Sequence, residues 1–462
     1  MAGTASAHPT HRPGKHTRRL LHLLVWSAVA WACAEGEDPP VDPPVPVPSP
    51  RAEAGAEPAP NRGLWKRARV RSSDADLSEP EREMVRHLET LGYVAGSQSA
   101  TGLKSVTRNL QGRVAPGLNF LTSGHAPEAL LMNDRGDILH RWHGAFRSLF
   151  PNSDRPAPSY WRRAHLFPNG DVIAIFGGQG MARLDSRSRV IWTSALQAHH
   201  DLDIAANGDV YVLTRQINRV EGIHSGQPFG EDFVTVLDAE GRMKRNISLV
   251  EALYRSPYSS LFDPSKSVFG DLLHTNSVAL LDGRLSDRIP EFESGRVLVS
   301  FLVPSLIAVV DMEEGRVVWA HRGSFRNQHD PNVLDNGNLL LFDNLGDPHS
   351  SLVREFDPAS GHSVWTYRGS EAEPFRSATC GAAQRLGNGN TLITESDAGR
   401  AFEVDERGEI VWEFHNPHRA GEEGEFVAAL LEVRRLPESF PSDWIDPETV
   451  GHRRGAARRQ EP

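Results

Sequence analysis

The sequence predicts an all-β fold, a six-bladed β-propeller in which strands from the two ends of the chain share one blade. The first observation is a repeat of apolar runs joined by Asn-Gly or Asp-Gly, the strongest short signal for a β-hairpin. The second is that Trp319, Trp365 and Trp412 lie 46 and 47 residues apart. A four-stranded propeller blade takes roughly 40–50 residues. A pair of β-sandwiches, the competing fold, gives no reason for such even spacing.

Five complete copies of the repeat can be read along the chain, and a sixth is divided between its ends. The complete copies span residues 165–195, 199–249, 273–323, 328–369 and 380–415. The divided copy combines residues 125–142, an outer half, with residues 425–435, an inner strand. Joining these two pieces hides the strand edges that an open ring would leave exposed. The propeller is therefore expected over residues 115–436, followed by a polar tail at 437–462.

Composition narrows the classes of function. The 462 residues carry a formal net charge of -10 with no concentrated basic segment, which argues against nucleic acid as a partner. The two cysteines, Cys33 and Cys380, are too few for a small secreted domain stapled by disulfides. The sequence gives no indication of the oligomeric state.

The N-terminal segment has the features of an export signal. Arg18 and Arg19 precede an apolar run at residues 20–32, which is shorter than the roughly 20 residues that a membrane-spanning helix needs. A basic start, a short apolar stretch and a small residue before Cys33 are typical of a lipoprotein signal peptide over residues 1–33. We expect export to the periplasm or the cell surface, with lipidated Cys33 as the only membrane attachment. A plainly cleaved signal and an uncleaved anchor are the alternatives.

Two short segments separate this signal from the repeats. Residues 34–77 are rich in proline, which favours extended conformations and cannot build a core, so we expect a linker. A short helix is expected within residues 78–95. Ser78 can cap its start, Glu81 stands at the capping-box position, and Gly92 can end it.

Histidine recurs where the predicted blades begin. The histidines at these starts are His165, His199 or His200, His274 and His329. In a propeller this position enters the innermost strand, so such side chains converge near the mouth of the central channel. Imidazole can serve there as a nucleophile, a general acid or base, or a metal ligand. The structural alternative is that each histidine only bonds neighbouring strands.

Polar neighbours favour a functional role for part of this set. The candidate catalytic residues are His329, His274 and His200, which lie in the segments QHD, HTNS and HHD. The candidate substrate-binding residues are His199, Asn276, Asp330, Arg354 and Arg385.

Several segments carry a resemblance to a known family. They are HHDLDI at 199–204, LHTNSV at 273–278, QHDPNVLDNGNLLLFDN at 328–344, and the stretches 124–142 and 377–396. Over about residues 115–436 the chain resembles the arylsulfotransferase (aryl-sulfate sulfotransferase) family.

The resemblance implies a periplasmic six-bladed propeller that moves a sulfuryl group from a phenolic sulfate ester to a phenol, with no cofactor and no nucleotide sulfate donor. In this family a channel histidine is transiently sulfated, while other histidines and an arginine bind the sulfate oxygens and protonate the leaving phenol. QHD lies in the most family-like segment, so His329 is the first choice for the central role. His274 and His200 would orient the sulfate or donate a proton.

Two departures from the family pattern keep other functions open. The family's arginine stands just after the FDN turn, where residues 345–348 contain none. The fifth blade starts with Cys380 and the sixth with Phe426, so neither offers a histidine. A diverged propeller that binds an anionic or phenolic ligand in its channel is therefore the alternative to an enzyme. A third alternative is a metal site built from the three candidate catalytic histidines, since converging imidazoles can hold a transition metal.

Overall fold

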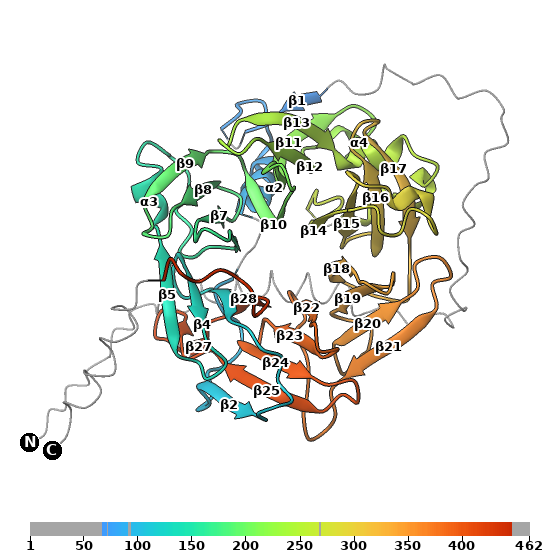
Figure 1. The fold of residues 1–462 in the computed structure, drawn as a ribbon. Coiled ribbons are helices and arrows are strands. Elements are labelled where there is room, and N and C mark those ends of the chain that lie inside the picture. The colour runs from blue at the N-terminus through green and yellow to red at the C-terminus, as the bar shows by residue number, and fades with distance from the viewer. Residues whose placement is uncertain (1–66, 72, 91–93, 268, 446–462) are drawn as a thin grey trace, which may run out of the picture. The chain divides into compact units, whose positions relative to one another are not determined.

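The computed structural model describes residues 67–445, except residues 72, 91–93 and 268. Apart from one small two-stranded sheet, the strands of this part form six sheets that follow one another around a ring (Figure 1). The predicted six-bladed β-propeller is therefore confirmed.

Several of the predicted segments lie outside the described residues. These are the signal peptide with Cys33, most of the linker, and the end of the polar tail from residue 446. Export and lipidation of Cys33 stay predictions, which fatty-acid labelling of the wild type and of Cys33→Ser would test. In the part of the chain that is described, no helix is both long and apolar enough to cross a membrane.

Each blade is built on an antiparallel sheet of four strands, given in order from the ring centre outward. Blade 1 contains β28 (Leu430–Arg435), β3 (Asn119–Ser123), β4 (Glu128–Met132) and β5 (Ile138–His143). Blade 2 contains β6 (Arg163–Leu166), β7 (Val172–Phe176), β8 (Gly180–Leu184) and β9 (Val190–Ser194). Blade 3 contains β10 (Ala198–Ile204), β11 (Val210–Val220), β12 (Phe229–Leu237) and β13 (Met243–Ser248).

The other three blades follow the same order. Blade 4 contains β14 (Thr275–Leu280), β15 (Val297–Phe301), β16 (Leu306–Asp311) and β17 (Arg316–His321). Blade 5 contains β18 (His329–Val333), β19 (Leu339–Asp343), β20 (Leu352–Phe356) and β21 (Ser363–Arg368). Blade 6 contains β22 (Ala382–Arg385), β23 (Thr391–Glu395), β24 (Arg400–Val404) and β25 (Ile410–His415).

Strand β28 closes the ring by pairing antiparallel with β3, from Leu430 opposite Ser123 to Arg435 opposite Asn119. As predicted, the two ends of the chain share blade 1, but the pieces that they contribute differ in extent from the predicted ones. The N-terminal part supplies three strands, because β3 precedes the predicted outer half. The C-terminal part supplies only β28. The preceding residues form a separate small hairpin of β26 (Arg419–Ala420) and β27 (Phe426–Val427).

The turns explain why the repeat is so visible in the sequence. Between the first and second strands of four blades an Asn-Gly pair places glycine in the left-handed region, with φ between 83° and 90°: Gly170, Gly208, Gly337 and Gly389. A residue with a Cβ atom would be strained there. Between the third and fourth strands, an Asp or Asn side chain accepts backbone N–H groups two and four residues later, at Asn133, Asp185, Asp238 and Asp405.

Tryptophans on the outermost strands join neighbouring blades. In three cases the indole N–H donates to a turn carbonyl of the next blade: Trp142 to Gly170 at 2.9 Å, Trp192 to Ala239 at 3.0 Å, and Trp412 to Asp134 at 2.7 Å. Such a bond contributes about 0.5–1.5 kcal/mol, in addition to the burial of the ring. The bond of Trp412 spans the junction between blade 6 and blade 1, where the ring closes.

Segments before the first blade attach to this frame at several places. β1 (Arg67–Arg69) pairs with the protruding end of β11, and β2 (Ser105–Asn109) pairs with β25 at the outer edge of blade 6. Helix α2 (Glu79–Thr90) lies within the segment expected to be helical, and its capping box is formed by Ser78 and Glu81. The remaining α-helices of the described part are α3 (Phe146–Leu149) and α4 (Leu249–Tyr254).

Removal of β28 should open the ring. A chain that ends at Ala428 exposes the inner edge of β3 and uncovers apolar residues of blade 1, so we expect insoluble protein or loss of cooperative unfolding. The measurement is the soluble yield together with thermal unfolding followed by circular dichroism. A control chain that ends at Ile445 keeps every described strand and should remain soluble. Cooperative unfolding of the shorter chain would show that β28 is not needed for closure.

Candidate functional site

Histidine stands at the start of three consecutive inner strands. His199 and His200 are the second and third residues of β10, His274 directly precedes β14, and His329 begins β18. The backbone is left-handed at His200 and His274, with φ of 49° and 47°, and the pairing of both inner strands shifts in register beside them. Non-glycine residues in this region carry strain of about 1–3 kcal/mol and cluster at functional sites.

These histidines meet at the ring centre. Nδ1 of His199 lies 2.8 Å from Nδ1 of His200. The ring of His200 meets the ring of His274 edge to face, with centroids 5.0 Å apart. Burial, and then the charges of Arg162, His274 and the other histidines including His329, lower the pKa of His200 well below its usual value. The three predicted catalytic residues therefore lie near one another, and we call them, with His199 and Arg162, the central cluster.

A buried arginine and two carboxylates support two members of the cluster. Arg215, on β11, binds Asp232 at 2.7 Å and Asp271 at 2.9 Å. Asp271 accepts a hydrogen bond from His274 Nδ1 at 2.6 Å, and Asp232 lies 3.5 Å from His199 Nε2. Burial alone would raise the pKa of Asp271, but Arg215 and His274 lower it to about 2. The ionised Asp271 fixes the proton of His274 on Nδ1 and leaves Nε2 to bind a ligand or to exchange a second proton.

The hydrogen bonds of His329 define its tautomer. Nδ1 lies 2.8 Å from Oδ1 of Asn344 and 3.0 Å from the carbonyl oxygen of Asn327. The amide nitrogen of Asn344 donates to the carbonyls of Ser377 and Cys380, so the oxygen of this side chain must face His329. Both partners of Nδ1 are therefore acceptors, and Nδ1 carries the proton. Nε2 is left with a lone pair.

That lone pair is buried and has no partner. Within the described part of the chain, Nε2 of His329 forms no hydrogen bond, although the residue is only 4% exposed. Burial is the main cause that lowers the pKa of His329 to about 4, and the charge of Arg162 acts in the same direction. The ring is therefore neutral at physiological pH. A buried polar atom without a partner calls for an explanation, and a bound ligand is one.

Arg162 supplies a cation at this point. It directly precedes β6, where its backbone N–H donates to the carbonyl of Ile175, and it is 5% exposed. Its guanidinium lies 3.7 Å from Sγ of Cys380 and acts electrostatically on His200 and His329. Sequence reasoning missed this residue. The available signal was its position just before the inner strand of blade 2, where blade 4 has a histidine.

A second layer of charged side chains connects four blades. Arg163 binds Asp201 and Glu432, both at 2.8 Å, and lies 3.6 Å from Asp330. All four residues are nearly buried, and Asp330 also accepts the backbone N–H of Ala383. The structure therefore gives Asp330, a predicted substrate-binding residue, a role in holding the blades together.

The other predicted binding residues have different surroundings. His199 is fully buried between His200 and Asp232, which suits positioning of His200. Asn276 donates to the carbonyl of Gln328, the residue before His329, and its Oδ1 is buried without a partner among the described residues. Asn276 can therefore accept a hydrogen bond from a ligand beside His329.

Three residues considered from the sequence are not brought to the cluster. Arg354 is on β20, two strands out from β18, and pairs with Asp343. Arg385 ends β22, pairs with Glu355 and lies over Trp365. His165 is the third residue of β6 rather than its start, and burial, with the charge of Arg434 next, lowers its pKa to about 4. The expectation that His165 shares the position of the other histidines is wrong, because Arg162 occupies that position.

The metal alternative for the three histidines is not supported by their geometry. Among the described residues, one group of at least three potential ligands has donor atoms within 4.8 Å of one another. That group is His125, Glu128 and His418, which lies outside the central cluster.

Helix α2 borders the central cluster. Burial lowers the pKa of His87 on this helix, and the charges of Asp271, Arg215 and His274 also act on it. The ring of His87 lies 5.2 Å from that of Phe269.

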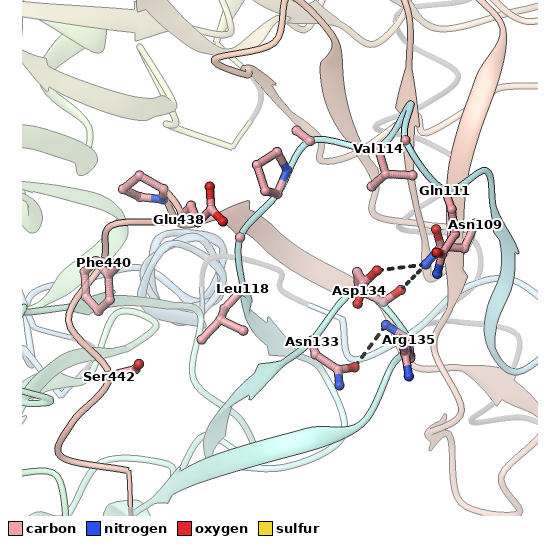
Figure 2. Close-up of a pocket in the computed structure, with 15 residues that line it drawn as sticks. Asn109, Gln111, Val114, Leu118, Asn133, Asp134, Arg135, Glu438, Phe440 and Ser442 are labelled. Atoms are coloured by element: carbon pink, nitrogen blue, oxygen red, sulfur yellow. Dashed lines mark hydrogen bonds between the residues drawn. The ribbon is translucent and has the colours of Figure 1, made fainter.

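Two surface cavities of about 580 and 560 Å³ do not include the cluster. Figure 2 shows the first, which is lined by Asn109, Leu118, Asp134 and Phe440 among others. Leu118 precedes β3, at the end of this strand opposite to Ser123, so this cavity lies away from the strand starts that carry the histidines. The second cavity lies between blades 3 and 4 and is lined by Tyr211, Arg245 and Met312 among others.

Comparison with known proteins gives one family match. A family model described as Arylsulfotransferase (ASST) matches residues 163–417, more than half of the chain. No curated protein is a significant match.

Solved structures with similar folds are distant in sequence. A protein of unknown function from Bacteroides caccae is 13% identical, with a TM-score of 0.46, over 69% of this chain and 98% of that one. A catalytically inactive virginiamycin B lyase from Staphylococcus aureus is 10% identical, with a TM-score of 0.36, over 68% and 89%. BamB from Moraxella catarrhalis is 12% identical, with a TM-score of 0.31, over 68% and 77%. None of these likenesses bears on function.

Replacement of Arg163 should expose the dependence of the ring on its central ion pairs. Arg163→Met leaves Asp201 and Asp330 buried without their ion-pair partner and leaves Glu432 with Arg434 alone, so the free energy of unfolding should fall by about 3–5 kcal/mol at pH 7.5. Burial already raises the pKa of Asp330 in the native protein. Carboxylates with a raised folded-state pKa bind protons more readily in the folded state. The deficit should therefore shrink as the pH falls towards 5.

Urea unfolding of the wild type and the variant at both pH values measures this effect. Arg189→Met, which removes an ion pair whose arginine is 73% exposed, is the matched control and should change stability by less than about 0.5 kcal/mol. An equal deficit at both pH values would contradict the assignment of the loss to unpaired buried carboxylates.

Proposed function

The chain belongs to the arylsulfotransferase family, and from this premise we propose that it transfers a sulfuryl group from a phenolic sulfate ester to a phenolic acceptor through His329. The observation that carries the proposal is the buried lone pair of His329 Nε2 beside the charge of Arg162. A neutral imidazole is a good nucleophile. A sulfuryl group in transfer, like a phosphoryl group, carries spread negative charge that a fixed cation stabilises.

In the first half-reaction Nε2 of His329 attacks the sulfur atom, and the bond between sulfur and the phenolic oxygen breaks. Arg162 faces the sulfuryl oxygens, for which a planar guanidinium offers paired N–H donors. His274 gives the leaving phenolate a proton from Nε2. Asp271, bonded to Nδ1 of His274, compensates the positive charge that this ring carries before it donates.

In the second half-reaction the acceptor phenol attacks sulfur, and the bond between sulfur and Nε2 breaks. His274 takes the proton of the acceptor and returns to its starting state. While Nε2 is sulfated, the His329 ring carries a positive charge and still has its proton on Nδ1. The oxygens of Asn344 and Asn327 accept from this N–H and stabilise the intermediate.

The remaining members of the central cluster position the group in transfer. His200 is neutral at physiological pH, because burial and the nearby charges lower its pKa, and His199 holds its ring through the bond between the two Nδ1 atoms. His200 therefore shapes the site without adding charge to it. The unpaired Oδ1 of Asn276 can accept from a protonated acceptor oxygen. By the export signal predicted in the sequence, this reaction takes place outside the cytoplasm.

The proposal is tested with a chromogenic aryl sulfate as donor and a series of phenols as acceptors. The wild type should release the chromogenic phenol faster when an acceptor is added. His329→Ala should lose about 10³-fold or more of the activity, and Arg162→Ala about 10²–10³-fold, while both keep the wild-type circular dichroism spectrum. His362→Ala, which replaces an exposed histidine outside the cluster, is the matched control and should retain full activity.

The outcomes separate the functions that the sequence left open. Full activity of His329→Ala would show that this residue is structural. A wild type that binds phenolic sulfates at the central cluster but transfers nothing would replace the enzyme with a binding propeller. That result would fit the presence of Cys380, rather than histidine, beside Arg162.

A further inference from the structure

Three potential metal ligands meet at the junction where the ring closes. His125 lies in the turn between β3 and β4, Glu128 is the first residue of β4, and His418 lies between β25 and the hairpin that leads to β28. One donor atom from each of these side chains lies within 4.8 Å of the other two. Two imidazoles and a carboxylate with room for a water molecule form a typical donor set for zinc.

The ring of His125 is held in the way that metal-binding histidines are held. Its Nε2 lies 2.8 Å from Oε1 of Glu128, and its Nδ1 lies 3.0 Å from Oγ of Ser123. Oγ of Ser123 also accepts a hydrogen bond from the amide of Asn416. A histidine ligand characteristically donates its second ring N–H to a neighbouring oxygen, which fixes the orientation of the ring. Nε2 shares a proton with the Glu128 carboxylate in the structure described, and a metal ion that binds Nε2 displaces this proton while Nδ1–H stays directed at Ser123.

His418 faces the same point from blade 6. Its ring is stacked on that of His125, with centroids 3.6 Å apart and an angle of 6° between the planes. Asn416 accepts the backbone N–H of His418, so one asparagine supports both histidines. An ion cannot lie in the planes of two parallel rings at once. Coordination therefore requires one ring to rotate out of the stack.

Glu128 keeps one carboxylate oxygen available for a metal ion, although Arg141 competes for this side chain. Arg141 also contacts Glu128, and both this contact and that of His125 use Oε1. Oε2 can bind an ion while Arg141 stays on Oε1. The side chains of His125 and Glu128 are 11% and 10% exposed, so solvent reaches both, and a water molecule is the usual fourth ligand of a zinc ion with three protein ligands.

We propose that His125, Glu128 and His418 bind one divalent transition-metal ion, Zn²⁺ in first place, which clamps blade 1 to the segment that leaves blade 6. The ligands Glu128 and His418 are 290 positions apart in the sequence and come together only when the ring is closed. An ion that binds the closed ring and not the unfolded chain stabilises the fold by mass action. The clamp therefore reinforces the junction that otherwise depends on β28.

The test uses the purified full chain after treatment with a chelator. Metal analysis after equilibration with Zn²⁺ should find one more ion per chain in the wild type than in His418→Ala. Thermal unfolding of the wild type should shift upward by about 3 °C or more when Zn²⁺ is added. The shift should be absent in His418→Ala and reduced in Glu128→Gln, which keeps the volume of the side chain. His8, His11 and His16 are common to all of these proteins, so ions bound there cancel in the difference.

Two controls identify the site. His362→Ala, at an exposed position, and His329→Ala, in the central cluster, should both keep the wild-type shift and ion count. Equal ion counts and equal shifts in the wild type and His418→Ala would overturn the proposal. So would loss of the ion in His329→Ala with retention in His418→Ala, because the ion would then lie at the ring centre.

Discussion

The hydrogen-bonded ladder between β28 and β3 holds the two ends of the chain together, and the convergence of the inner strands depends on it. An open row of blades would leave the starts of these strands in an arc. In the closed ring Arg162, His200, His274 and His329, which come from four different blades, lie close enough to influence one another electrostatically. The hydrogen bond of the Trp412 indole crosses the same junction. The ion pairs of Arg163 cross the ring centre. The same contacts therefore stabilise both the ring and the site.

Burial determines the chemical state of the central cluster. It is the largest cause of the lowered pKa values of His200 and His329, and so these rings are neutral where an exposed histidine would be partly charged. The permanent charges are arginines, of which Arg215 is neutralised by Asp232 and Asp271. Arg162 contacts the thiol of Cys380. The neutral imidazole of His329 and the charge of Arg162 give the site a nucleophilic nitrogen and an anion-binding group within the same buried space.

Local sequence signals were sufficient for the fold. Asn-Gly turns such as Asn169–Gly170 require a left-handed glycine, and outer-strand tryptophans, three of which bond to the next blade, stand at the same place in successive blades, so both recur with the period of the structure. The convergence of the histidines followed from their shared position in the repeat. What could not be predicted depends on contacts between distant segments.

Several site residues illustrate that limit. Arg162 was missed because the repeat of blade 2 was taken to begin at His165, three residues further on. Asp271 lies in an irregular segment before β14, and only the folded chain brings it to Arg215. Asn344 belongs to a family-like segment, yet its control of the His329 tautomer depends on carbonyl groups of the next blade. Arg354 was a plausible cation by sequence, but β20 carries it away from the ring centre.

The central claim, that Nε2 of His329 is the atom which receives the sulfuryl group, is tested most directly by trapping. The wild type is mixed with an aryl sulfate in the absence of an acceptor, quenched under alkaline conditions and digested, and its peptides are examined by mass spectrometry. The account predicts one added sulfuryl group, located on His329 and absent when Arg162 is replaced by alanine. A protein that consumes the donor while the group resides on His200, His274 or Cys380, or on no residue, would contradict it.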